Sequence, residues 1–176
     1  FFYAYTSSSS GELSAERYYL SNQLSKKVDE KNFRFIYGSF NNDHFSGYEF
    51  QSGVAVGVGR YFIDDKKTVL KANIGPGYGV DRMDGTDTDS SKTISGFLLR
   101  VAADYSWEFS EGATFAENIW LIAGFNTIGR SVTSLTVKVF RQVHLSMSYT
   151  FSYTEDAAPG KTPYDTQTTM SLLYQF

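Results

Sequence analysis

Bulky apolar residues alternate with small or polar residues along most of the chain. Between positions 48 and 62 the even-numbered residues are mainly aromatic or branched aliphatic, whereas the odd-numbered residues are mainly glycine or polar. The same period of two recurs over residues 70–80, 96–109, 144–153 and 169–176. A helix would scatter these residues around its circumference, but successive side chains of a strand point to opposite faces of a sheet. The alternation therefore predicts an all-β chain.

Polar breaks divide these runs into strands, and the breaks alternate in length. Short turns are expected near residues 29–32, 64–67, 110–113 and 140–142. Longer polar connections are expected near residues 7–12, 42–46, 81–92, 126–130 and 154–165. Strands joined in this way pair with their sequence neighbours in antiparallel fashion. We therefore expect about ten strands in an up-and-down meander, in a single domain that covers residues 1–176, with the short turns at one end.

The glycines indicate which face of the sheet is concave. Gly53, Gly57, Gly75 and Gly79 share their parity with polar residues such as Lys71, while the bulky residues take the opposite face. Because the concave side of a closed sheet has less room for each residue, small and polar side chains are expected inside and bulky apolar ones outside. Such a surface is tolerated in lipid, so the pattern predicts an antiparallel up-and-down transmembrane β-barrel. A soluble barrel of the lipocalin type, with its apolar face inside, is the alternative.

Composition excludes several other classes of protein. Aromatic residues make up 17% of the chain, and many of them fall near strand ends, as interfacial girdles do. No run approaches the roughly 18 consecutive apolar residues of a membrane-spanning helix. Without cysteine, no disulfide framework or thiolate metal site is possible, and no cofactor is expected. A net charge of −3 argues against nucleic acid as a partner.

The two ends of the chain carry expectations about export. The chain opens directly on strand-like residues without a secretory signal, so we expect a mature or truncated product. The last strand ends in Phe176, which is similar to the signal read by the barrel-assembly machinery of the outer membrane. The carboxyl terminus lies at the same end as the short turns, and in this class of barrel that end is periplasmic. The short turns are therefore expected on the periplasmic side. Outer-membrane lipid and lipopolysaccharide are the other expected partners.

Several segments resemble, in order, those of the salt-stress-induced (YdiY-like) outer-membrane protein family of Gram-negative bacteria. They are ERYYLS at 16–21, FSGYEFQ at 45–51, GRYFID at 59–64, GPGY at 75–78, SVTSLTVK at 131–138, PGK at 159–161 and SLLYQF at 171–176. The resemblance covers nearly the whole chain and implies a barrel of the bacterial outer membrane with no established biochemical activity. It also implies about two further strands before the equivalent of Phe1, hence a twelve-stranded barrel. Gly79 stands where the family often has arginine.

The inward-facing polar residues are the candidate functional residues. They can form a selectivity lining for small solutes, or a plug of mutually paired charges that fills a narrow lumen. The mixture of signs favours the plug, and hence a non-catalytic role in envelope structure or limited passage of small solutes. The predicted lumen-lining residues are Arg17, Glu49, Gln51, Lys71, Asn73, Arg100, Asp104, Glu108, Lys138 and His144.

A barrel enzyme that hydrolyses lipid or peptide at the extracellular rim is the alternative function. His144 and Ser146 have a spacing that puts both side chains on one face of a strand, but that face points inward at the periplasmic end. Asp43 and His44 could activate water in a long loop, although such a pair is usually just solvated. The acidic run 84–89 lacks the glutamate that closes a typical calcium loop, so a solvated turn is expected there.

Overall fold

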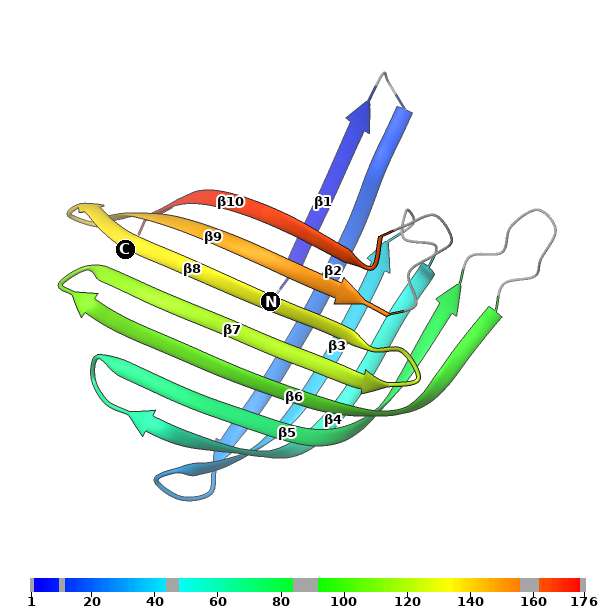
Figure 1. Ribbon diagram of the computed structural model, residues 1–176, viewed down its shortest axis with the longest axis horizontal. Helices are drawn as coiled ribbons and strands as arrows, with labels where there is room; N and C mark the ends of the chain where they lie inside the picture. The colour runs from blue at the N-terminus through cyan, green and yellow to red at the C-terminus, as the bar shows by residue number, and fades with distance from the viewer. Residues whose placement is uncertain (1, 10–11, 44–47, 84–91, 156–161, 175–176) are drawn as a thin grey trace.

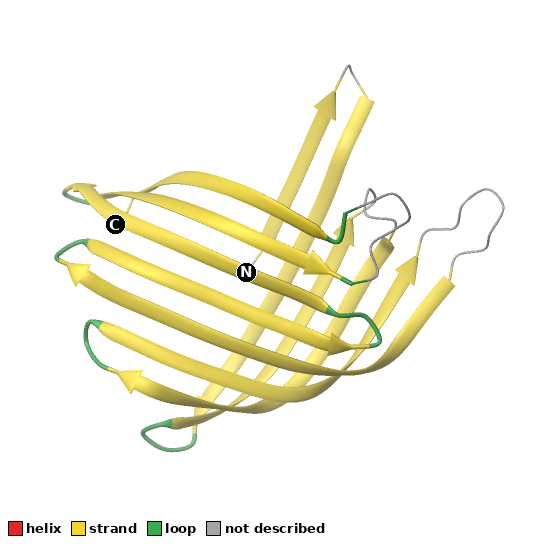
Figure 2. Ribbon diagram, in the orientation of Figure 1, coloured by secondary structure: helices red, strands yellow, loops and turns green. Residues whose placement is uncertain are grey.

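The computed structural model describes residues 2–9, 12–43, 48–83, 92–155 and 162–174, and the side chains of residues 18–42, 49–83, 92–155 and 162–174. Figures 1 and 2 show strands and turns and no helix in this part of the chain. The strands are β1 (Phe2–Ser9), β2 (Glu12–Lys27), β3 (Asn32–Asp43), β4 (Tyr48–Asp64), β5 (Thr68–Met83), β6 (Lys92–Ser110), β7 (Ala113–Gly124), β8 (Ile128–Phe140), β9 (Val143–Thr154) and β10 (Tyr164–Tyr174). No helix long and apolar enough to cross a membrane occurs in the described residues.

All ten strands form a single sheet in which the spatial order is the sequence order. Every strand is antiparallel to the next, which confirms the up-and-down meander predicted from the spacing of the breaks. Figure 1 shows that the sheet is strongly curled: β6 to β10 lie in front, β4 and β5 pass below, and β1 to β3 lie behind. Within the described residues β1 pairs only with β2 and β10 only with β9. The sheet is therefore compatible with a barrel wall, but it does not close into a ring.

Four short turns gather at one end of the sheet, as predicted, at residues 28–31, 65–67, 111–112 and 141–142 (Figure 2). In the first, the Asp29 carboxylate accepts hydrogen bonds from the backbone N–H groups of Lys31 and Asn32 at 2.8 and 2.7 Å. In the third, Gly112 adopts a φ of +82°, a region that glycine enters without steric cost. Local side-chain bonds and glycine thus set these turns.

The opposite end of the sheet departs from the prediction at one connection. The expected longer loop near 126–130 is a three-residue link, 125–127, because Gly129 and Arg130 already belong to β8. Asn126 in this link is only 6% exposed, and its Nδ2 donates a hydrogen bond to Asp81 Oδ2 at 3.0 Å. This hydrogen bond satisfies the buried amide and holds the link against the sheet.

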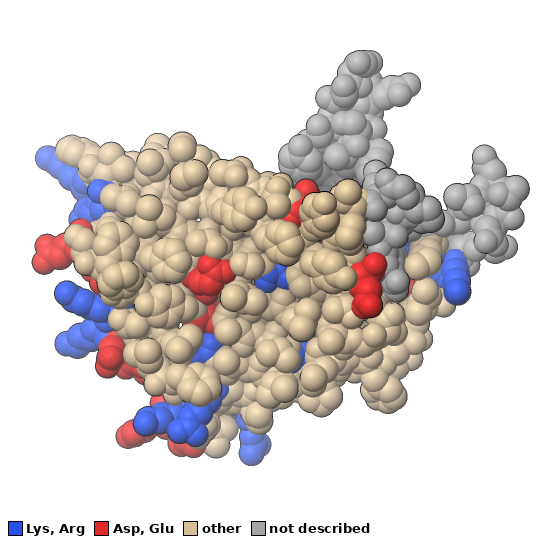
Figure 3. Space-filling view, viewed as in Figure 1, with Lys and Arg blue, Asp and Glu red and all other residues tan. Residues whose placement is uncertain are grey.

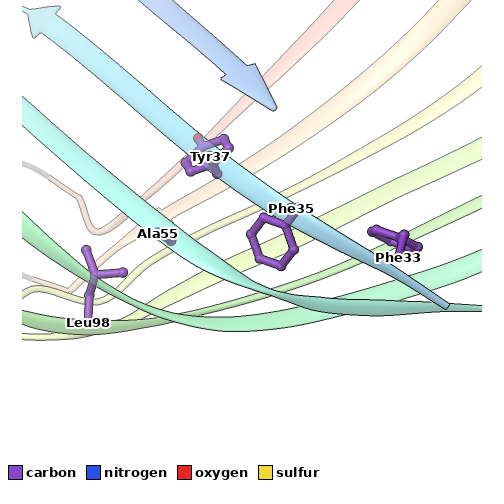
Figure 4. Packing of buried hydrophobic residues seen from close by; sticks show 5 residues of the cluster. All are labelled: Phe33, Phe35, Tyr37, Ala55 and Leu98. Carbon is purple, nitrogen blue, oxygen red and sulfur yellow. The ribbon is translucent and has the colours of Figure 1, made fainter. Parts of the chain in front are cut away.

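The two faces of the sheet differ as the alternation predicts. On β4, Val54, Val56 and Val58 are 55–62% exposed on the outer face, whereas Ala55 between them is 2% exposed on the concave face. Hydrophobic residues are nevertheless buried on the concave face as well, so its interior does not consist of small and polar side chains alone. The buried cluster consists of Phe33, Phe35 and Tyr37 from β3, Ala55 from β4 and Leu98 from β6 (Figure 4).

Glycines make room for this cluster. Phe33 pairs with Gly59 and Phe35 with Gly57 in the β3–β4 register, and each ring lies over its glycine. A Cβ atom on Gly57 would lie 2.7 Å from Cε1 of Phe35, and one on Gly59 would overlap the Phe33 ring. Gly57 and Gly59 therefore leave the space in which the two aromatic rings pack against the strand, as well as relieving crowding in a curved sheet.

Candidate functional site

Arg100 lies near the middle of β6, on the concave face. Its Nη1 donates a 2.6 Å hydrogen bond to Oδ1 of Asn73 on the neighbouring strand β5. The guanidinium carbon lies 4.1 Å from the ring centroid of Tyr37 and 5.6 Å from that of Phe35. Only 6% of Arg100 and 3% of Asn73 is exposed. A buried cation is thus held by two aromatic faces and an amide oxygen, an arrangement that suits the planar guanidinium better than an ammonium group.

An ion pair lies on the same face, nearer the short turns. Lys71 and Asp104 are direct cross-strand partners on β5 and β6, and their Nζ and Oδ2 atoms are 3.5 Å apart. Asn118 on β7 donates a 2.5 Å hydrogen bond to the other carboxylate oxygen of Asp104. Both charged side chains keep about 30% of their exposure, so their mutual attraction is weakened by solvent. The group ties three adjacent strands together across the concave face.

A third polar group surrounds Asp81 at the loop end of β5. Asp81 is 4% exposed and accepts hydrogen bonds from Gln51 Nε2 at 3.2 Å and from Asn126 Nδ2 at 3.0 Å. Asn41 extends the chain of amides by donating to Gln51 Oε1 at 3.1 Å. A cavity of about 90 Å³ adjoins these side chains and is also lined by Trp120. A space of this size holds a few water molecules, and its polar walls suit them.

The predicted lumen-lining residues fall into separate groups. Gln51, Lys71, Asn73, Arg100 and Asp104 belong to the three arrangements above. Glu49 forms a 2.7 Å ion pair with Arg82 Nε, where both side chains are 40–43% exposed. Glu108, Lys138 and His144 lie near the short turns, with Lys138 opposite His144 in the β8–β9 register. The side chain of Arg17 lies outside the described residues, although its backbone pairs with Asp43. The sequence-based set is therefore not one connected network.

Several residues of this face were missed by the sequence reasoning. Phe33, Phe35 and Tyr37 occupy the concave face of β3, but Ile36 and Phe40 make the other face equally bulky, so parity alone could not orient this strand. The glycines at the paired positions of β4 are the signal that could have done so. Asp81 and Asn126 were assigned to long loops, and nothing in their local sequence indicates that they meet.

One carboxylate lies on the outer face. Glu117 on β7 pairs in register with Tyr105 and Thr133, both on the side of the bulky apolar residues. Its two carboxylate oxygens accept hydrogen bonds from Ser131 Oγ at 2.6 Å and from Thr133 Oγ1 at 2.5 Å. Two hydroxyl donors partly replace the water that a carboxylate would lose at an apolar surface.

The described residues provide no arrangement of side chains that supports the catalytic or metal-binding alternatives. His44, the side chain of Asp43 and the acidic run 84–89 lie outside them. Ser146 is within reach of Thr136, whose Oγ1 lies 2.9 Å from Ser146 Oγ. Among the side chains that the structure describes, no group of three or more His, Asp or Glu is arranged to hold a metal ion.

Comparison with known proteins places the chain in a family. Residues 1–176 match the model of the family described as "Protein of unknown function, DUF481". The chain belongs to the DUF481 family. It is also 25% identical over 174 residues to "Uncharacterized protein YdiY" of Escherichia coli (strain K12), across 97% of this chain and 66% of that protein. This DUF481 member thus spans about two thirds of the length of the curated relative it matches, and the YdiY-like resemblance is confirmed. No solved structure matches it with significance.

Proposed function

We propose that this chain forms the wall of an integral β-barrel of the bacterial outer membrane. The observation that carries the proposal is the distribution of exposure across the sheet. Val54, Leu99 and Phe151 are 62%, 42% and 41% exposed on the outer face, while Arg100 is 6% exposed on the inner one. Apolar surface in water costs about 25 cal/mol per Å² relative to a hydrocarbon environment. A bilayer removes this cost over the whole outer face, and a soluble fold with this surface would aggregate.

The lengths and ends of the strands support the same proposal. Strands β2 to β10 contain between 11 and 19 residues, and a tilted strand needs about 9–11 to cross hydrocarbon. Trp107 and Phe109 near the short turns, and Tyr78 and Phe97 near the opposite end, are exposed aromatic residues of the kind that form interfacial girdles. Figure 3 shows charged side chains concentrated at the end that carries the short turns, beside a largely uncharged wall. We assign the short turns to the periplasm.

Closure of the barrel is part of the proposal. Among the described strands, the outer edges of β1 and β10 pair with no further strand, and hydrocarbon offers no hydrogen-bond partner to an open edge. In the membrane these edges pair with each other, or with the two further strands that the family resemblance implies. The carboxyl-terminal residues up to Phe176, which lies outside the described residues, would be the segment read by the assembly machinery, and lipopolysaccharide would be a further partner.

The lumen is proposed to be largely plugged, which suits a role in envelope structure or in limited passage of small solutes. On the concave face Lys71 pairs with Asp104, and Arg100 is held by Asn73 and by the aromatic rings that fill the space beside it. A selective ring would carry one sign of charge, but here both signs occur. The cavity of about 90 Å³ beside Asp81 has room for a few water molecules.

We further propose that the chain is not an enzyme and that it uses no cofactor. His144 lies on the concave side near the short turns, opposite Lys138, whereas a lipid-cleaving site needs access to the membrane at the other rim. The test is turnover of phospholipid, lipopolysaccharide and peptide substrates by the purified protein, with an inactive barrel and a known hydrolase as controls. Activity lost on replacement of His44 by alanine would contradict this proposal.

Two experiments test the membrane proposal. The first is cell fractionation followed by refolding in detergent, where the folded barrel is expected to run anomalously on gels unless boiled. A protein that is monodisperse and folded in plain buffer would contradict the proposal. The second is planar-bilayer conductance, in which a plugged lumen gives little or no current. Large, stable openings would show an open channel and refute the plug, although the barrel itself would stand.

A further inference from the structure

Three basic residues lie on the outer face beside the turn between β2 and β3. They are Lys26 on β2, Arg34 on β3 and Arg60 on β4, and each of them is exposed. Their parity places them with Leu24, Ile36 and Val58, the residues that would face acyl chains. Because β2 ends at Lys27, β3 begins at Asn32 and β4 ends at Asp64, the cations lie within a few residues of the rim, at the depth of lipid headgroups.

This arrangement is unfavourable unless an anion joins it. Lys26 and Arg34 are direct cross-strand partners, and like charges directly opposite each other in a sheet repel. No carboxylate forms an ion pair with Lys26, Arg34 or Arg60 among the described residues. Asp29 of the adjoining turn interacts electrostatically with Arg60 without forming an ion pair, and its carboxylate already accepts hydrogen bonds from Lys31 and Asn32. The cluster therefore presents a surplus of positive charge.

Two apolar grooves run from this cluster along the outer face. One has a volume of about 590 Å³ and is lined by Leu24, Ile36 and Val56. The other has a volume of about 530 Å³ and is lined by Phe62, Ile74 and Val101. Arg34 and Val58 line both grooves and thus form the ridge between them. Lys26 lies in the first groove and Arg60 in the second.

We propose that this surface is a binding site for one phospholipid with an anionic headgroup, in the periplasmic leaflet. The phosphate is held by Arg34 together with Lys26 and Arg60, and the two acyl chains lie in the grooves on either side of the Arg34–Val58 ridge. The occupant follows from the chemistry: one cationic cluster between two apolar channels matches one phosphate attached to two chains. Arginine suits this role because its planar fork binds phosphate oxygens in pairs. The inference rests on the proposed membrane location.

The test is native mass spectrometry of the protein folded in detergent and titrated with dioleoyl phosphatidylglycerol or dioleoyl phosphatidylcholine. One phosphatidylglycerol is expected to bind about tenfold more tightly than phosphatidylcholine. The triple variant Lys26→Gln, Arg34→Gln, Arg60→Gln is expected to lose this preference. A matched control, Lys66→Gln, Lys67→Gln, Arg141→Gln, removes the same charge from two other short turns and should keep it. Equal affinities for the two lipids, or equal losses in both triple variants, would overturn the site.

A second pair of variants tests the grooves without changing charge. Val58→Trp places an indole on the ridge and is expected to weaken phosphatidylglycerol binding several-fold, whereas Leu135→Trp, on the outer face of β8, leaves it unchanged. Equal effects of the two variants, or a dimer mass in place of bound lipid, would refute the proposal. Folding in detergent with no lipid preference would refute only the lipid site, whereas folding in plain buffer would refute the membrane location itself.

Discussion

The guanidinium of Arg100 lies 4.1 Å from the ring centroid of Tyr37 on the concave face of the sheet. The two residues are 63 positions apart by their numbers and come from β6 and β3. Tyr37 and Asn73 together hold the charged side chain of Arg100, a residue that is only 6% exposed. A buried charge that loses its partners is costly, so this contact joins the two sides of the curled sheet.

Replacing Arg100 by alanine should therefore destabilise the folded protein. We expect a loss of about 2–4 kcal/mol in the free energy of unfolding. The substitution opens a cavity and leaves the buried Oδ1 atom of Asn73 without its hydrogen-bond donor. Arg100→Lys should recover only part of this, since an ammonium cannot stack on Tyr37 as a planar group does. Urea titrations of protein in lipid vesicles, followed by tryptophan fluorescence, measure both. Lys138→Ala, at an exposed position of the same face, is the control and should change little.

The packing of the Phe33 ring against Gly59 gives a second prediction. Gly59→Ala places a methyl group inside the volume of the ring, and overpacking of this kind costs about 1–3 kcal/mol. Gly38→Ala is the matched control, because no atom lies within 4 Å of its added Cβ. The same urea titration compares them. Phe33→Ala in the Gly59→Ala background should relieve the strain, so a double-mutant cycle without coupling would contradict the packing argument.

The short turns differ in how well their residues suit the backbone. Gly112 has a φ of +82°, and Arg141 has a φ of +41° although it is not glycine. Gly112→Ala should destabilise by about 1–2 kcal/mol, because its Cβ would also lie 2.7 Å from Cβ of Lys138. Arg141→Gly should stabilise by up to about 1 kcal/mol, because it removes the penalty of a left-handed residue. Thermal unfolding in detergent measures both changes in stability. A more stable Gly112→Ala variant or a less stable Arg141→Gly variant would refute the turn geometry.

The turn at residues 28–31 should make stability depend on pH. Hydrogen bonds from the Asn32 side chain and from the backbone N–H groups of Lys31 and Asn32 hold the pKa of Asp29 below its usual 3.8. A lowered pKa adds stability that is present above the unfolded value and is lost as the pH falls through the folded one. Wild type should thus exceed Asp29→Asn in stability at pH 6, and the difference should shrink as the pH falls below 3.8. Asn32→Ala should weaken this dependence, and an unchanged pH profile in both variants would contradict it.

The local pattern was enough to predict the strands and the turns. Alternation over 48–62 and 96–109 marked β4 and β6, and polar breaks marked the four short turns, because side-chain parity and turn chemistry are encoded within a few residues. The orientation of β4 also followed, since Gly57 and Gly59 alternate with the three valines. β3 could not be oriented in the same way, because both of its faces are bulky.

By itself, then, the sequence determined that this chain is a ten-stranded meander with one apolar and one mixed face. Only the tertiary structure decided that Phe33 and Phe35 fill the concave side, that Asn126 reaches Asp81, and that Lys26, Arg34 and Arg60 form one cluster. The reason is physical: parity is a property of a single strand, whereas these contacts depend on the register between strands and on the curl of the sheet. Both arise from many weak pairings acting together.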